Sequence, residues 1–115
     1  MKRLIFITFF VLLSSSEVIA QKHAPKLQQK TAWLPGIYPE ASKRLLRLSD
    51  VEGLTSWDLK VMRNEIYARH GYIFKTQDMI DYFSQQDWYK TRYNNVNSMI
   101  TALEKRNIIF IRKYE

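Results

Sequence analysis

The spacing of apolar residues between positions 55 and 71 predicts a helix that is covered on two sides. At about 100° per residue, two groups of mostly apolar positions fall on opposite faces. One face comprises Leu59, Met62, Ile66 and His70, and the other comprises Trp57, Val61 and Ala68. Thr55 and Asp58 have the spacing of a capping box at the start, and Gly71 can take the left-handed conformation that ends a helix. A helix that is apolar on two sides normally lies between other elements, so we expect this one at the centre of the fold.

Two further helices are predicted from their capping residues. Thr76 is a suitable N-cap for a short helix over residues 77 to about 86. Thr101 and Glu104 form a second capping box, which opens a last helix that runs through residue 114. A buried asparagine in this last helix would need hydrogen-bond partners, which we expect from loop backbone or from the first helix. The apolar face of the last helix comprises Ile100, Leu103, Phe110, Ile111 and Tyr114, with Asn107 in its middle.

The fold class predicted by these patterns is mainly α: a small single-domain helical fold of about three main helices plus short turns. A helical turn is expected at residues 49–52, and a short β element at residues 45–48 is left open. The chain has no cysteine, so we expect no disulfides and a core held by packing alone. We expect the domain to be a monomer.

The first twenty residues have the organisation of a cleavable secretory signal. Lys2 and Arg3 precede the apolar run LIFITFFVLL, which is too short to span a bilayer comfortably, and small or modest residues end at Ala20. We therefore expect residues 1–20 to be a signal peptide, with no stable membrane insertion after its cleavage. Residues 21–35 have the composition of a linker, and residues 36–115 are expected to form the domain. The expected location is the periplasm or the extracellular space.

The distribution of charge argues against a nucleic-acid partner. The whole chain has a net charge of +7, yet residues 36–115 contain 13 basic and 10 acidic residues, a net charge of +3. A nucleic-acid binder usually concentrates basic residues much more strongly along one face. With three glycines in the chain, phosphate-binding loops are excluded. The lack of cysteine and of a paired-histidine motif predicts no metal and no cofactor.

Ionisable side chains are built into the predicted central helix. Glu65 and Arg69 are four residues apart, in the order that favours an ion pair along a helix. If the helix is central, these charges must find partners, because an unpaired buried charge is strongly destabilising. His70 is the one histidine of residues 36–115 and therefore the candidate for acid–base chemistry. Its position beside Gly71 suits a structural role at the helix C-terminus as well.

A dense group of aromatic residues follows this helix. Phe74, Phe83 and Trp88 are expected in the core, because large aromatic rings dominate the buried area of small domains. Tyr89 and Tyr93 lie in a polar stretch and are expected to be exposed.

The run from Arg63 to Gly71, RNEIYARHG, together with Phe74, resembles the signature of the YARHG domain family. The family is named for the five residues Tyr67 to Gly71, and the resemblance covers about residues 36–115. The resemblance implies a bacterial protein, exported or membrane-tethered, that acts at the cell envelope on or against cell-wall material. It implies no established catalytic residue. Further matching positions include Tyr38, Pro39, Ser42, Trp88, Tyr89, Glu104 and Asn107.

These observations lead to a candidate binding surface around the C-terminal end of the first helix. We expect an exported cell-envelope binding module, whose partner is a cell-wall polymer or an envelope protein, with Arg69 contacting a carboxylate or phosphate. Two alternatives stay open: a small cell-wall-modifying hydrolase in which His70 works with a carboxylate, and a structural domain whose polar motif is an internal network. The candidate residues are Arg63, Glu65, Tyr67, Arg69, His70, Trp88 and Tyr89.

Overall fold

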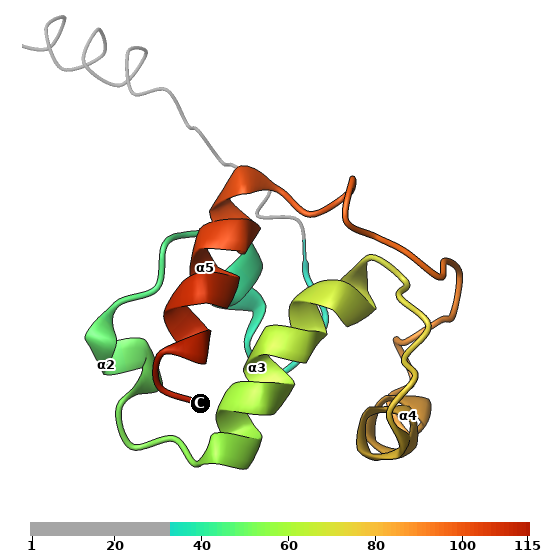
Figure 1. Cartoon of the computed structure of the whole chain (residues 1–115), viewed down its shortest axis with the longest axis horizontal. Helices are drawn as coiled ribbons and strands as arrows, with labels where there is room; N and C mark the ends of the chain where they lie inside the picture. The colour runs from blue at the N-terminus through green and yellow to red at the C-terminus, as the bar shows by residue number, and fades with distance from the viewer. Residues whose placement is uncertain (1–32) are drawn as a thin grey trace, which may run out of the picture. The chain divides into compact units, whose positions relative to one another are not determined.

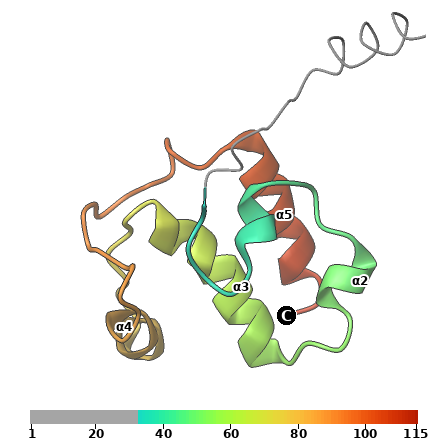
Figure 2. The same cartoon turned by 180° about the vertical axis from the view of Figure 1, so that it is seen from behind.

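The computed structural model of the chain describes residues 33–115. The expected signal peptide and residues 21–32 of the expected linker lie outside the described residues. No helix of the described part is long and apolar enough to cross a membrane. Apart from one isolated bridge between Tyr72 and Tyr93, residues 33–115 contain no β-structure, so the predicted helical fold class is confirmed. The elements are η1 (Pro39–Ser42), α2 (Leu48–Val51), α3 (Ser56–Arg69), α4 (Gln77–Ser84) and α5 (Ala102–Arg112) (Figures 1 and 2).

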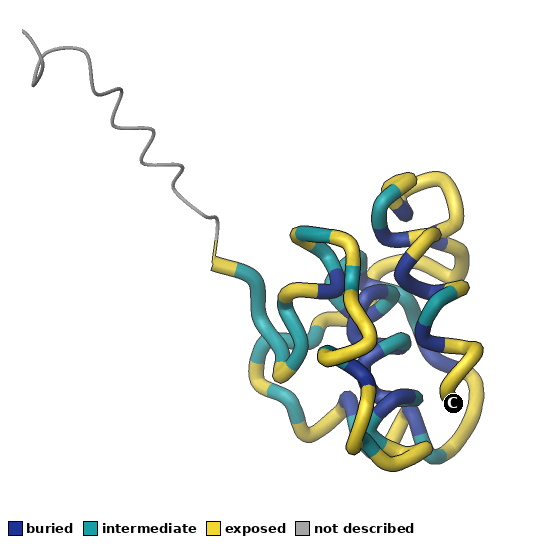
Figure 3. Tube along the Cα trace, turned by 90° about the vertical axis from the view of Figure 1, so that its left-hand side faces the viewer, coloured by how far each residue is buried: buried dark blue, intermediate teal, exposed yellow. Residues whose placement is uncertain are grey.

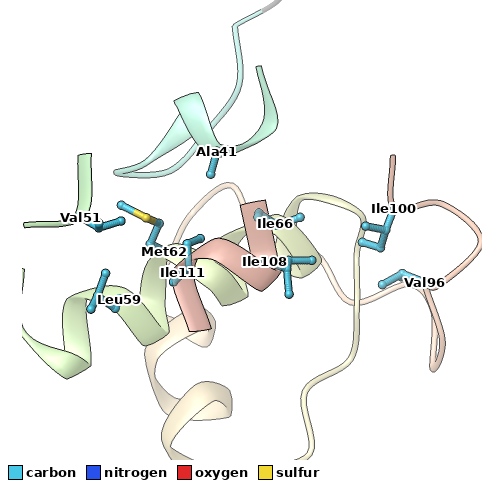
Figure 4. Packing of buried hydrophobic residues seen from close by; sticks show 9 residues of the cluster. All are labelled: Ala41, Val51, Leu59, Met62, Ile66, Val96, Ile100, Ile108 and Ile111. Atoms are coloured by element: carbon cyan, nitrogen blue, oxygen red, sulfur yellow. The ribbon is translucent and has the colours of Figure 1, made fainter. Parts of the chain in front are cut away.

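Helix α3 lies between two clusters of buried side chains, as its apolar pattern predicts. On one side it packs against α5 and η1, and on the other against α4 and the loop before it. Figure 3 shows buried positions toward the middle of the domain, with exposed positions on the outer sides of helices and along loops. The first cluster comprises Ala41, Val51, Leu59, Met62, Ile66, Val96, Ile100, Ile108 and Ile111 (Figure 4). The second comprises Ala68, Phe74, Met79 and Phe83.

Trp57 is an exception to the two-sided pattern. It was expected on the face opposite Leu59, but it lies in the first turn of α3 and is 45% exposed. Its ring meets the edge of the Tyr82 ring, with 6.0 Å between the centroids. Trp57 therefore contacts Tyr82, which packs against the second cluster, but is not itself part of that cluster.

The predicted capping boxes are present at both long helices. Thr55 Oγ1 accepts a hydrogen bond from the Asp58 backbone N–H at 3.1 Å, and the Asp58 carboxylate accepts one from the Thr55 N–H at 3.1 Å. Thr101 and Glu104 form the same reciprocal pair at the start of α5. Gly71 follows α3 with φ +85°, the left-handed conformation that its position requires. Helix α4 ends two residues earlier than predicted, and α5 ends at residue 112 instead of 114.

The buried face of α5 is rotated from the face that apolar spacing predicts. Leu103 and Phe110 are only half-buried, and Tyr114 lies beyond the helix end and is 46% exposed. The physical reason is that two polar side chains of α5, Glu104 and Asn107, form hydrogen bonds with η1 and the segment after it, and therefore occupy part of the buried face. The buried positions are Glu104, Asn107, Ile108 and Ile111.

Asn107 replaces the backbone pairing that a strand at residues 45–48 would need. Its Oδ1 accepts a hydrogen bond from the Leu46 N–H at 2.9 Å. Its Nδ2 donates to the carbonyl oxygens of Ala41 and Arg44, both at 2.8 Å. Residues 45–48 contain no β element, and Leu48 begins α2.

The aromatic group divides between the core and its rim. Phe74 and Phe83 are buried, as expected, and their rings stack with centroids 4.6 Å apart. Trp88 is half-buried against them instead of fully enclosed. Tyr89 is also half-buried, contrary to expectation, because its hydroxyl donates to the Tyr72 carbonyl at 2.6 Å. Tyr93 is 45% exposed, as expected.

Phe83→Ala should lower the free energy of unfolding by about 3–5 kcal/mol, because it removes the fully buried ring that joins α4 to α3. Ile80→Ala, in the same helix at a 39% exposed position, should lower it by less than about 1 kcal/mol. Urea unfolding followed by circular dichroism measures both values. Similar losses of unfolding free energy in the two variants would contradict the central position of Phe83 in the second cluster.

Candidate functional site

Glu65 and Arg69 form a buried ion pair near the C-terminal end of α3. The Glu65 and Arg69 side chains are 1% and 5% exposed, and their nearest charged atoms, Oε1 and Nη1, are 3.5 Å apart. The Glu65 carboxylate also accepts hydrogen bonds from the backbone N–H groups of Ile37 and Tyr38, both at 2.8 Å. The charge of Glu65 is therefore balanced by one guanidinium and two backbone amides.

The remaining donors of Arg69 bind the segment that leads into η1. Its Nε and Nη2 donate to Ser42 Oγ at 3.1 and 2.8 Å, and its Nη1 donates to the Pro35 carbonyl at 3.0 Å. Burial lowers the pKa of Arg69, and the carboxylate of Glu65 opposes that effect. Because the Pro35 carbonyl takes part, the end of the segment expected to be a linker belongs to the folded unit.

Glu104 connects this pair to His70. The Ser42 hydroxyl donates to Glu104 Oε2 at 2.7 Å, and Glu104 Oε1 lies 2.9 Å from His70 Nε2. The Glu104 side chain is 4% exposed. Burial acts to raise its pKa, but hydrogen bonds from the Thr101 backbone, His70 and Ser42 outweigh burial and hold the pKa below its usual value. Glu104 is thus ionised and fully bonded inside the fold.

The five side chains form one network in the order Glu65, Arg69, Ser42, Glu104 and His70. In a hydroxyl nucleophile system, the imidazole contacts the hydroxyl and the carboxylate orients the imidazole. Here the carboxylate lies between the hydroxyl and the imidazole, so His70 cannot take the Ser42 proton. The arrangement joins η1, α3 and α5, and its evident chemistry is to hold these elements together.

Three of the five network residues, Glu65, Arg69 and His70, were among the candidate residues of the sequence analysis. The spacing of Glu65 and Arg69 indicated their pairing, but Ser42 and Glu104 were not among the candidate site residues. Glu104 was explained by its capping box, which uses only part of the carboxylate. Ser42 lies 27 residues from Arg69 in the sequence, and its only sequence signal was its match to the family resemblance.

The structure separates the seven candidate residues into four groups. Glu65 and Arg69 are internal, and their polar atoms are used by the network. His70 and Trp88 line one open hollow, whereas Arg63 and Tyr67 line another. Tyr89 lines neither hollow, and its hydroxyl donates to the Tyr72 carbonyl.

The first hollow, which we call the basic hollow, has a volume of about 330 Å³. It combines an imidazole with aromatic rings and two exposed cations, and none of its lining residues is acidic. The side chains that matter most for its chemistry are His70, Trp88, Lys90, Arg92 and Tyr93.

One of these cations, Arg92, packs against Gly71. The stem of Arg92 crosses Gly71 so closely that a Cβ on the glycine would lie 2.9 Å from Arg92 Cβ. The Gly71 carbonyl accepts hydrogen bonds from the N–H groups of Arg92 and Tyr93 at 2.8 and 3.0 Å, and the Tyr93 carbonyl accepts one from Ile73 at 2.9 Å. The loop that carries the basic side chains is therefore fixed against the end of α3.

The second hollow, which we call the asparagine hollow, has a volume of about 380 Å³. Its walls are polar but contain no acidic side chain. Arg63 at its edge binds Glu115 with two hydrogen bonds of 2.7 and 2.8 Å. The other polar residues of the lining are Asn64, Tyr67, Tyr72, Asn94, Asn95, Asn97 and Arg112.

The fold and these sites define a small helical domain with an internal ionic network and two open polar hollows. The chain belongs to the YARHG domain family, whose model matches residues 36–115. Domains of this family are found in exported proteins. No curated protein and no solved structure matches the chain. Within residues 33–115, no three histidine, aspartate or glutamate side chains gather in a way that could hold a metal ion.

Gly36→Ala should destabilise the fold more than Gly53→Ala does. Both glycines have positive φ, so each variant should lose about 1 kcal/mol of unfolding free energy from backbone strain. A Cβ at Gly36 would lie 2.7 Å from Glu65 Oε1 and 2.9 Å from Arg69 Nη1, whereas nothing lies within 4 Å at Gly53. The overlap should cost Gly36→Ala about 1–3 kcal/mol more. Equal losses on urea unfolding would show that the ion pair tolerates displacement.

Stability should fall in acid, and Glu104→Gln should reduce that dependence. The folded-state pKa of Glu104 lies below its ordinary value of 4.5, so its stabilising contribution is complete above that pH and is lost as the pH falls through the folded-state pKa. The variant should be less stable than wild type at pH 7, with a shallower decline between about pH 5 and 2. Some slope should remain, because a hydrogen bond from Arg44 lowers the pKa of Asp50 to about 2. Parallel curves for the two proteins would contradict this account.

Proposed function

We propose that this domain is a non-catalytic binding module that holds an anionic polymer of the cell wall in its basic hollow. The polymer would be an acidic glycan or peptidoglycan, held by its carboxylate or phosphate groups. The observation that carries the proposal is the pair of exposed cations beside aromatic rings in a hollow without acidic residues.

The charge of the hollow supports an anionic ligand. Lys90 and Arg92 are exposed, and neither forms an ion pair with any acidic side chain of residues 33–115. Guanidinium and ammonium groups bind carboxylates and phosphates through charge-assisted hydrogen bonds. Because Lys90 and Arg92 are not paired with acidic residues of the described fold, both are free to bind an anionic ligand.

The aromatic rings support a ligand with apolar faces in addition to its charge. Trp88 is half-buried, and Tyr93 is 45% exposed at the same hollow. Rings anchored by one edge and open at the other provide contact area at low entropic cost. Sugar rings and peptide side chains of cell-wall material have apolar faces that would fit against them.

The position of His70 favours binding over hydrolysis. Its Nε2 faces the Glu104 carboxylate at 2.9 Å, which orients the ring, but no hydroxyl of residues 33–115 is hydrogen-bonded to it. The nearest serine in the network donates to the carboxylate instead. His70 therefore contributes a polar wall to the hollow, and the cations beside it supply the attraction.

The location proposed for this activity is outside the cytoplasm. The expected signal peptide and the occurrence of YARHG domains in exported proteins both support export. Cell-wall polymers are reached by exported proteins from the periplasm or from the outer surface.

Sedimentation of the full chain with isolated cell-wall sacculi tests the proposal. Lys90→Ala/Arg92→Ala should weaken binding about tenfold, because two exposed charge contacts are lost. Binding by wild type should also weaken as salt is added, since the contacts are screened.

The matched control is Lys43→Ala/Arg106→Ala, which removes the same charge from exposed positions outside the hollow. It should bind sacculi nearly as well as wild type. Equal weakening in the two double variants would mean that net charge alone drives attachment. Failure of folded wild-type protein to sediment with sacculi would refute the proposed function.

A further inference from the structure

We propose that the asparagine hollow is a second ligand site, which takes an acidic pyranose, a sugar ring that carries a carboxylate. The choice of a cell-wall sugar rests on the function proposed above. None of the residues that line this hollow lines the basic hollow; they come from α3, from the loops at Tyr72 and at residues 94–97, and from the end of α5.

The polar groups of this hollow suit a hydroxyl-rich ligand. Asn94, Asn95 and Asn97 bring three amide side chains to one short loop, and Tyr67 and Tyr72 add two phenol hydroxyls. Each amide both donates and accepts hydrogen bonds, as each sugar hydroxyl does. Neither phenol hydroxyl is hydrogen-bonded to another group of residues 33–115, so both can serve a ligand.

Asn64 provides a buried acceptor beside these groups. Its Nδ2 donates to the Lys60 carbonyl at 2.8 Å, and only the amide NH₂ can face a carbonyl, so the orientation of the side chain is fixed. Asn64 is 9% exposed, and no donor of residues 33–115 reaches its Oδ1. Leaving a buried acceptor unpaired is unfavourable, and a ligand hydroxyl in the adjoining hollow would relieve it.

The charges select an acidic sugar over a neutral one. The hydrogen bonds of Arg63 to Glu115 neutralise that guanidinium and raise its pKa. Arg112 is exposed and forms no ion pair with the acidic residues of the described chain, although, beside the hydrogen bonds from Arg63, it helps to lower the pKa of the Glu115 carboxyl. One cation thus stays available in a hollow without acidic walls, which favours a single carboxylate on the ligand.

The two tyrosine rings provide the apolar surface. Tyr67 and Tyr72 are half-buried, with ring centroids 6.0 Å apart and planes tilted by 56°. Both pack on the hydrophobic clusters, which hold them in place without ligand. Preorganised rings can contact the C–H face of a pyranose without a large loss of side-chain entropy.

The probe is free N-acetylmuramic acid, with N-acetylglucosamine as the matched sugar that lacks the carboxylate-bearing ether. Titration of the ¹⁵N-labelled full chain should shift the side-chain NH₂ signals of Asn94, Asn95 and Asn97. The acidic sugar should bind about fivefold more tightly than the neutral sugar, the effect of one exposed ion pair. Shifts confined to other residues, or equal affinity for the two sugars, would overturn the proposal.

Arg112→Gln should remove the preference for the acidic sugar while both sugars still bind. Arg106→Gln, an exposed arginine of the same helix that does not line the hollow, should keep the preference. Tyr72→Phe retains the ring and removes only the hydroxyl, so it should weaken both sugars while the folded spectrum is preserved. If N-acetylmuramic acid bound Arg112→Gln and wild type identically, the assigned role of Arg112 would be wrong.

The outcomes separate this inference from the proposed function. Lys90→Ala/Arg92→Ala should weaken sedimentation with sacculi about tenfold but leave the N-acetylmuramic acid titration unchanged. Sedimentation with sacculi without any effect of the free sugar would reject the second site alone. A titration at the asparagine hollow without sedimentation would reject the polymer-binding function alone.

Discussion

The ion pair of Glu65 and Arg69 is the interaction on which the N-terminal half of the fold depends. Two charges on the inner part of a helix are tolerated only where every polar atom is bonded, because the loss of hydration is otherwise uncompensated. The partners are backbone groups of residues 35–38 and the Ser42 hydroxyl. The pair therefore fixes the segment of residues 35–42 against α3. Gly36 permits the close approach, since any side chain there would overlap the carboxylate.

The network also explains why α5 presents polar groups to the interior. Glu104 and Asn107 bind the segment before α2 through Ser42, Leu46 and two backbone carbonyls. If this face of α5 were apolar, the backbone groups of residues 41–46 that now bind Asn107 would be buried without hydrogen-bond partners. The η1 segment has a few turn hydrogen bonds of its own, and side chains from two helices bind further polar groups of the segment. The interface of α5 with α3 and η1 therefore combines apolar packing by Ile108 and Ile111 with hydrogen bonds from Glu104 and Asn107.

Sequence reasoning succeeded where the determinants are local and stopped where they are distant. Capping boxes at Thr55 and Thr101, the glycine at position 71 and the pairing of residues four apart all act within one or two helical turns. The partners of Arg69 and Asn107 are separated from them by 27 to 66 residues. Periodicity cannot specify such pairs. It also misplaced the buried face of α5, because apolar spacing gives no weight to a buried glutamate whose partners are unknown.

The five residues from Tyr67 to Gly71 serve the fold and the two hollows at once. Ala68 packs in the second cluster, and Arg69 is enclosed in the network. Tyr67 lines the asparagine hollow and His70 lines the basic hollow. Gly71 leaves room for the stem of Arg92 beside the end of α3. Substitutions within this run therefore change folding and the two surfaces together. The chemistry of each hollow is better separated through residues outside the run, on the loop after α4 and near the end of α5, where exposed cations contribute little to the core.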